Sequence, residues 1–164
     1  MKTLYLVRHA KSDWENRNLL DIERHLNERG YSNANMMSKS LKEKKITPNL
    51  IISSPAVRAL STALIFARNL NYSPNTILIK EELYETSVKD YLSVISTIKD
   101  EFNTIFLFAH NPTISSLADA LTKTLPIEMP TCALAGINFD MNSWADIKIK
   151  KGELFLFDYP KKHE

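Results

Sequence analysis

Near its start the chain reads Leu4-Tyr5-Leu6-Val7-Arg8-His9-Ala10, an apolar run that stops at an arginine and a histidine. Much later, Thr104 to Ala109 is again apolar and is followed by His110. Short, uncharged, β-rich runs of this kind are typical of strands buried on both faces of a parallel sheet. Open α/β sheets hold their functional groups at the carboxyl ends of such strands. We therefore expect His9 and His110 to open into one crevice and to act as a catalytic pair.

A third apolar run, residues 50–53, is followed by residues typical of a helix start. Ser54 is expected to cap a helix whose first residue is Pro55 and which continues to Asn69. Arg58 then falls in or near the first turn. A guanidinium is poorly placed at the positive end of a helix unless an anion binds there as well. The sequence therefore predicts an oxyanion site at this helix start.

The rest of the chain continues the alternation of strands and helices. We expect a loop over 11–27, a helix over 28–44 capped by Asn27, a strand over 75–80, helices over 88–98 and 113–124, and two hairpin-paired strands over 132–140 and 152–159. The apolar face of the 28–44 helix is expected to carry Tyr31, Ala34, Met37 and Leu41. This order predicts an α/β fold, a three-layer sandwich with a mostly parallel central sheet flanked by helices. The 164 residues fit one domain, 1–164.

Composition excludes several classes of protein. A formal net charge of +2 is too small to indicate nucleic-acid or membrane-surface binding. Cys132 is the single cysteine, which excludes an internal disulfide and favours a reducing compartment. The first apolar run is too short for a signal peptide or a membrane span, so we expect a cytoplasmic protein. With three glycines, no phosphate-binding or dinucleotide-binding glycine loop can be drawn, and no nucleotide cofactor is expected.

Three short motifs occur in a fixed order along the chain. They are Arg8-His9, then Ser53-Ser54-Pro55 followed by Arg58-Ala59, then His110-Asn111-Pro112. Together they resemble the histidine phosphatase superfamily, which implies a phosphoglycerate mutase-like fold. The short length and Arg24-His25-Leu26 leading to Gly30 are most similar to the small SixA-like phosphohistidine phosphatases. Ala10 and Ala109 stand where glycine is common in the superfamily, and because alanine is tolerated after the first histidine among the SixA-like members, Ala10 is interpreted as a marker of that branch.

The resemblance implies a role for each central residue. His9 is expected to be the nucleophile, because a neutral imidazole nitrogen can attack phosphorus and hold the phosphoryl group until water removes it. Arg8 and Arg58 are expected to clamp the phosphoryl oxygens, since a guanidinium fork matches two oxygens and stays charged. A protonated His110 would donate a further hydrogen bond to these oxygens.

A general acid is needed to protonate an ester leaving group and later to accept a proton from water. In the superfamily this residue often follows a Leu-x-Glu pattern, which Leu83-Tyr84-Glu85 fits. We expect Glu85 to be this acid, with Glu82 as the alternative. A phosphohistidine substrate, whose leaving group is an imidazole, would need less help from an acid.

Residues of the loop after His9 are further candidates. Arg24 matches a pattern of the SixA-like branch and is expected either at the mouth of the phosphate pocket or on the surface. Ser12 and Asn16 are candidates for phosphate or substrate binding, although short polar loop residues commonly bond their own backbone. Trp14 is either a docking contact or a cover for the core.

The leading hypothesis is a metal-independent phosphatase that works through a phosphohistidine enzyme intermediate and acts on phosphohistidine in proteins. No metal is expected, because Arg8 and Arg58 would repel a divalent cation. The alternatives are a phosphatase of small phosphorylated metabolites and a catalytically silent phosphate-binding module. A mutase is disfavoured, because a short chain leaves little sequence for the enclosed pocket that a mutase requires.

Overall fold

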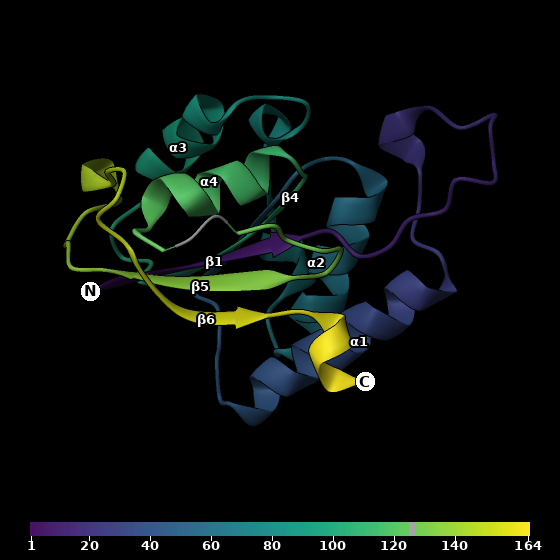
Figure 1. Cartoon of the computed structure of the whole chain (residues 1–164), viewed down its shortest axis with the longest axis horizontal. Helices are drawn as coiled ribbons and strands as arrows, with labels where there is room; N and C mark the ends of the chain where they lie inside the picture. The colour runs from purple at the N-terminus through teal and green to yellow at the C-terminus, as the bar shows by residue number, and fades with distance from the viewer. Residues whose placement is uncertain (125–126) are drawn as a thin grey trace.

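The computed structural model describes residues 1–124 and 127–164. Within them, six strands form one sheet in the order β3-β2-β4-β1-β5-β6 (Figure 1). The strands are β1 (Lys2–Arg8), β2 (Leu50–Ser53), β3 (Leu78–Ile79), β4 (Thr104–Ala109), β5 (Leu134–Phe139) and β6 (Glu153–Asp158). The first four pair in parallel, whereas β5 and β6 join as the predicted antiparallel hairpin. The predicted α/β fold is confirmed, and the sheet is mixed, with its parallel part at the centre.

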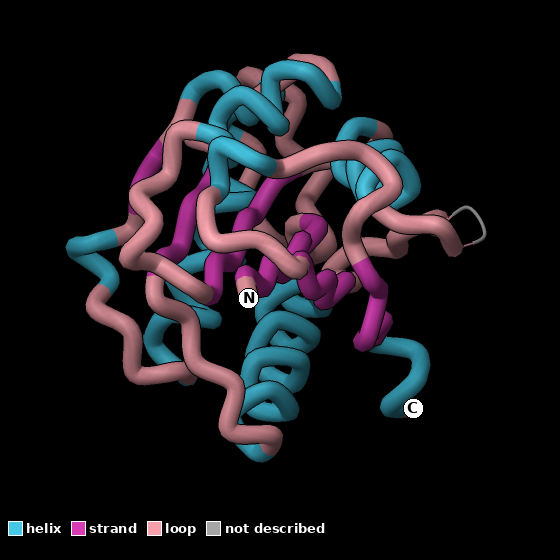
Figure 2. Tube along the Cα trace, turned by 90° about the vertical axis from the view of Figure 1, so that its left-hand side faces the viewer, coloured by secondary structure: helices cyan, strands magenta, loops and turns pink. Residues whose placement is uncertain are grey.

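Helices cover both faces of the sheet. Their bounds are α1 (Glu28–Glu43), α2 (Val57–Asn69), α3 (Val88–Ser96) and α4 (Thr113–Leu121). The first two lie on one face and the last two on the other, and Figure 2 shows the strands enclosed between them. Successive side chains of β1 enter the two cores alternately, which explains its unbroken apolar sequence. All helices in the described ranges fall short of the length and apolarity of a membrane-spanning segment.

Strand register decides which residues meet at the carboxyl edge of the sheet. Arg8 of β1 lies opposite Ala109 of β4, so the next residues, His9 and His110, leave the sheet at the same level. The backbone N–H of His9 still donates to the Ala109 carbonyl at 3.1 Å. On the other side of β4, the N–H of Ser54 donates to the Phe108 carbonyl at 3.0 Å. The segments that follow β1, β2 and β4 therefore place their functional residues at the same edge of the sheet.

The start of α2 differs from the prediction. The helix begins at Val57, and its cap position is held by Ala56, so neither the Ser54 cap nor a first helical Pro55 is correct. The Oγ of Ser54 instead accepts a hydrogen bond from the Ala56 N–H at 3.2 Å. Ser54 thus forms a turn ahead of the helix.

Other element ends also differ from the sequence predictions. The strand predicted over 75–80 is reduced to β3, because Pro74–Thr76 forms a 3-10 turn. The first strand begins two residues earlier than predicted, at Lys2. The helices α1, α3 and α4 end one to three residues early, and the two late strands are shortened by one or two residues at each end. On α1, Tyr31 is 46% exposed, so it lies outside the buried face that the other three predicted residues form.

The loop after His9 is fixed against the start of α1. As predicted, Asn27 caps α1: its Oδ1 accepts from the N–H of Gly30 at 2.8 Å. The N–H of Asn27 donates to the Lys11 carbonyl at 3.0 Å. A Cβ at Gly30 would lie 2.1 Å from that carbonyl oxygen, closer than real contacts allow. Glycine at this position therefore lets the loop and the helix approach each other.

Gly30→Ala should lower the free energy of unfolding by about 2–4 kcal/mol, because the methyl group displaces the Lys11 backbone or distorts the helix start. Urea unfolding followed by circular dichroism measures this change. Ser32→Ala, at an exposed position of the same helix, is the matched control and should change it by less than about 0.5 kcal/mol. Equal stabilities of the two variants would contradict the close approach.

Candidate active site

The two predicted histidines lie side by side. Their ring centroids are 5.3 Å apart, and the residues are only 7% and 9% exposed. Nδ1 of His9 lies 2.7 Å from the carbonyl oxygen of Ala10. Because a carbonyl can only accept, Nδ1 carries the hydrogen in the neutral ring, and Nε2 keeps its lone pair. Nε2 of His9 is therefore the atom available for attack on a substrate.

Both histidines are held neutral. Burial first, and then the positive charges of Arg58, Arg8 and Arg24, lower the pKa of His9 to about 4, although its bond to Ala10 opposes the shift. Burial, followed by the effects of His9 and Arg58, lowers the pKa of His110 to about 3. At neutral pH both rings are therefore uncharged, which is the form that a nucleophilic imidazole requires.

His110 is oriented by the segment that follows β2. Its Nε2 lies 2.8 Å from Oγ of Ser54, which the sequence analysis had assigned to helix capping. Its Nδ1 is buried and has no hydrogen-bond partner among the described residues. A buried nitrogen of this kind is normally satisfied, so Nδ1 is a free position for a ligand atom.

The two predicted arginines flank the histidines. Arg8 donates from Nη1 to the Met129 carbonyl at 2.9 Å. Burial lowers the pKa of Arg8, while the neighbouring carboxylate of Glu128 opposes the shift. Arg58 is 6% exposed. The Nε atoms of both arginines are buried and lack a partner among the described residues, like Nδ1 of His110. These three nitrogens can donate hydrogen bonds to the oxygens of a bound oxyanion.

Asp21, which the sequence analysis missed, compensates the charge of Arg58. Nη2 of Arg58 donates to Oδ2 of Asp21 at 3.0 Å, and Nη1 donates to the Asp21 carbonyl at 2.7 Å. The same carboxylate accepts from Nε of Arg24 at 3.0 Å and from the Tyr84 hydroxyl at 2.6 Å. Partial burial would raise the pKa of Asp21, but these hydrogen bonds outweigh it and lower the pKa below its ordinary value. The conflict predicted at the start of α2 is thus relieved by an anion of the chain itself.

Arg24 belongs to this network. It is 8% exposed, which decides against a surface position, and its Nη1 donates to Oγ of Ser12 at 2.6 Å. On its other side the guanidinium lies 3.5 Å from the ring centroid of Trp14. Trp14 is 73% exposed, so it does not cover the core. The i,i+3 spacing of Asp21 and Arg24 was the one signal in the sequence that could have identified Asp21.

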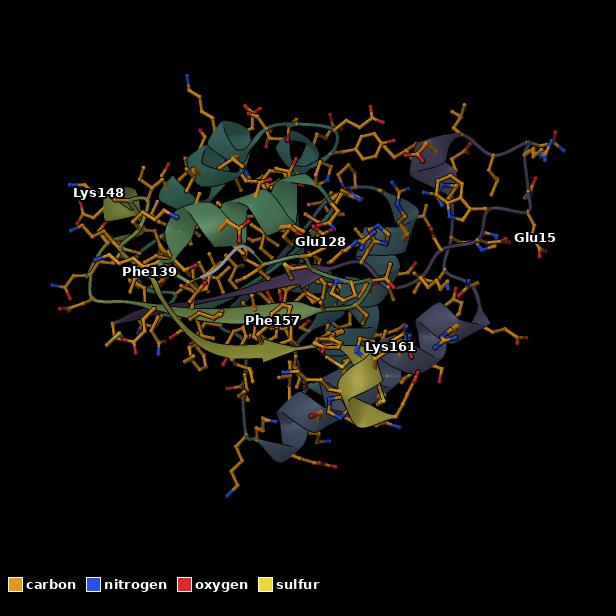
Figure 3. The ribbon with its side chains drawn as sticks, in the orientation of Figure 1. Glu15, Glu128, Phe139, Lys148, Phe157 and Lys161 are labelled. Atoms are coloured by element: carbon orange, nitrogen blue, oxygen red, sulfur yellow. The ribbon has the colours of Figure 1, made fainter. Side chains whose placement is uncertain are left out.

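Asn16 lies on the outer part of the loop. It is exposed, and its Oδ1 accepts from the backbone N–H of Asn18 at 3.1 Å. Figure 3 shows its neighbour Glu15 at the outer edge of the molecule. The contacts of Asn16 are therefore those of a residue bonding its own loop, and its role in substrate binding stays a prediction.

The two candidate acids lie in different places. Glu85 is exposed and adopts a left-handed backbone conformation, with a φ of 54°. It adjoins Tyr84, whose ring meets the His110 ring edge-on with 5.6 Å between centroids. Burial first, and then the carboxylates of Asp21 and Glu85, raise the pKa of the Tyr84 hydroxyl. Glu82 instead lines a surface hollow with Lys80. Glu85 thus adjoins a residue that packs on His110, whereas Glu82 lines a separate hollow, and the choice of Glu85 as the acid stays a prediction.

Comparisons with known proteins agree with this geometry. The sequence model of the histidine phosphatase superfamily (branch 1) matches residues 4–103. Protein ML1117 of Mycobacterium leprae is 27% identical over 94% of this chain and 100% of its own length. The crystal structure of SixA from Agrobacterium tumefaciens is 28% identical, with a TM-score of 0.81 over 97% of this chain and 98% of that one. A protein histidine phosphatase SixA solved with tungstate has the same fold, with 20% identity and a TM-score of 0.84 over 99% of both chains. The chain belongs to the histidine phosphatase superfamily, in its SixA-like branch.

Proposed function

We propose that this protein is a metal-independent phosphatase that works through a phosphohistidine at His9 and acts on phosphohistidine in proteins. The observation that carries the proposal is the set of three buried nitrogens, on Arg8, Arg58 and His110, that lack partners among the described residues beside a neutral His9. An uncharged nucleophile surrounded by unsatisfied donors is suited to accept a phosphoryl group and to hold its oxygens.

The reaction would proceed in two displacements. Nε2 of His9 attacks phosphorus, the new N–P bond forms, and the bond to the leaving group breaks with its electron pair going to that group. Water then attacks phosphorus and returns the electron pair to Nε2. In the second step Glu85 would accept the proton from water, and with an ester substrate it would donate a proton in the first step.

The surroundings of the site support the proposed substrate class. Few residues connect β3 to α3, and they leave little chain for a lid over the histidines. Tyr84 and Glu85 of this connection are accessible to solvent. A phosphorylated side chain on a protein surface can reach such a site, and the SixA-like relatives support this substrate class. Small phosphorylated metabolites are the second candidate, because an open site admits them as well.

His9→Ala should lower hydrolysis of a chemically phosphorylated histidine protein by about 10³-fold or more, because the nucleophile is lost. Release of inorganic phosphate in the presence of EDTA is the measurement. His25→Ala, which removes an exposed histidine of the same loop, is the matched control and should stay active.

Three results would count against the proposal in different ways. Activity in His9→Ala would exclude His9 as the nucleophile, and loss of wild-type activity in EDTA would exclude metal independence. A wild-type protein that cleaved small phosphoesters but no phosphohistidine would retain the mechanism and favour the second substrate class.

The protein should take up a proton when it binds an oxyanion. In the free protein the pKa of His110 lies at about 3, and a bound anion raises it, so His110 becomes protonated at pH values between its free and bound pKa. Affinity for the anion should therefore rise as the pH falls from 8 to 5. Sulfate is a suitable probe, because its charge is constant in this range, and calorimetry in buffers of different ionisation enthalpy counts the protons.

The His110→Gln variant is the control for this uptake. It should bind sulfate more weakly and take up fewer protons than the wild-type protein. Equal uptake by both proteins would show that the proton goes elsewhere and would contradict the donor role of His110.

A further inference from the structure

The loop after β1 starts and ends in a short antiparallel stem. Residues 11–13 pair with residues 25–27 through backbone N–H to carbonyl hydrogen bonds of 2.8 and 3.0 Å and an isolated β-bridge. Figure 1 shows this loop, in purple, extending beyond the carboxyl end of β1. Continuing the pairing by one residue places Trp14 opposite Arg24. Because side chains alternate along a strand, Ser12 and Trp14 share a face of the stem, and the Arg24 side chain contacts both.

The contact between Trp14 and Arg24 covers a charge and no part of the core. The guanidinium carbon of Arg24 lies 3.5 Å from the ring centroid of Trp14. Burial of a large apolar ring is favourable, yet Trp14 is 73% exposed, so burial does not account for its position. A guanidinium stacked on an indole face is attracted to it and loses contact with water on that side. The ring of Trp14 is therefore held in place by Arg24 and covers it.

The other side of Arg24 is connected to the phosphate clamp. Its Nη1 donates to Oγ of Ser12 at 2.6 Å, and its Nε donates to Oδ1 of Asp21 at 3.0 Å. The second carboxylate oxygen of Asp21 accepts from Nη2 of Arg58 at 3.0 Å. A continuous series of contacts thus runs from the exposed ring of Trp14 to Arg58.

We propose that Trp14 is a positioning residue, which fixes Arg24 and, through Asp21, keeps Arg58 aimed at the phosphoryl group. This inference rests on the proposed function and adds a residue outside the site on which the geometry of the site depends. An arginine side chain has many rotamers, and without the ring the face of the Arg24 guanidinium would be open to water. Asp21 would then be shared less firmly between the two arginines.

A positioning role and a docking role for Trp14 have different consequences. Arg58 holds the transferred phosphoryl group, which is common to every substrate. Loss of its alignment therefore slows the reaction of a protein substrate and of a small phosphoester by the same factor. A tryptophan that only docks a protein partner would affect the protein substrate alone.

The first test compares kcat/KM of Trp14 variants on a phosphohistidine protein and on phenyl phosphate. Trp14→Ala should lower both values about fivefold, because the contact with the guanidinium is lost. Trp14→Phe keeps an aromatic face and should restore both to within about twofold of the wild-type protein, whereas the aliphatic Trp14→Leu should not. Leu20→Ala is the matched control, since Leu20 is an apolar residue of the same loop that is 68% exposed, and it should change neither value.

The second test asks whether Trp14 acts through Arg24. In an Arg24→Met background, Trp14→Ala should cause no further loss of kcat/KM, because the contact is already absent. Urea unfolding of each variant ensures that only folded proteins are compared. A general structural role of Trp14 predicts the same loss in both backgrounds.

Four results would overturn the inference. They are unchanged kcat/KM on phenyl phosphate in Trp14→Ala, a loss confined to the protein substrate, a Trp14→Leu protein as active as Trp14→Phe, and an undiminished effect of Trp14→Ala in the Arg24→Met background. Failure of the proposed function looks different, because the wild-type protein would then turn over neither substrate. In that case calorimetry with sulfate replaces kinetics, and an affinity unchanged by Trp14→Ala would contradict the positioning role.

Discussion

Buried positive charge at the carboxyl ends of β1, β2 and β4 is the constraint on which this site depends. Arg58 and Arg24 are almost fully buried, and an uncompensated buried guanidinium is costly. Asp21 supplies the compensation and, by binding both arginines and Tyr84, joins the loop after β1 to the start of α2 and to the segment before α3. Burial, and after it the charge of the arginines, keeps both histidines neutral, so the residues that form the phosphate clamp also favour the nucleophilic form of His9.

The sheet positions the two histidines beside these charges. The register of β1 with β4 places His9 and His110 at one level, and the hydrogen bond of Ala10 sets the tautomer of His9. The backbone thus fixes where both histidines leave the sheet, while the ring of His110 is oriented by the hydroxyl of Ser54. The long loop after His9 is in turn fixed by the close approach of Gly30 to Lys11.

Most of the architecture was predictable, because uncharged strands and amphipathic helices leave strong periodic signals. The residues that the motifs marked, His9, His110 and the arginines, do lie together. Ser54 was misassigned, since a serine before a proline resembles a helix cap, whereas its hydroxyl lies beside His110. Asp21 was missed because two of its partners, Arg58 and Tyr84, come from distant segments, and its i,i+3 spacing from Arg24 is a weak signal in a loop without periodicity. Local sequence patterns identify helices, strands and motifs. Ion pairs between distant segments can be identified only once the fold is known.

The central claim is that the phosphoryl group passes through His9, and the stereochemical course at phosphorus tests it most directly. The substrate is a thiophosphoryl compound whose phosphorus is chiral because it carries one sulfur atom and two different oxygen isotopes. It is hydrolysed in water that supplies a third oxygen isotope. Each in-line displacement inverts phosphorus, so transfer to His9 followed by transfer to water predicts overall retention. Overall inversion would show a single displacement by water and would contradict a covalent intermediate on His9.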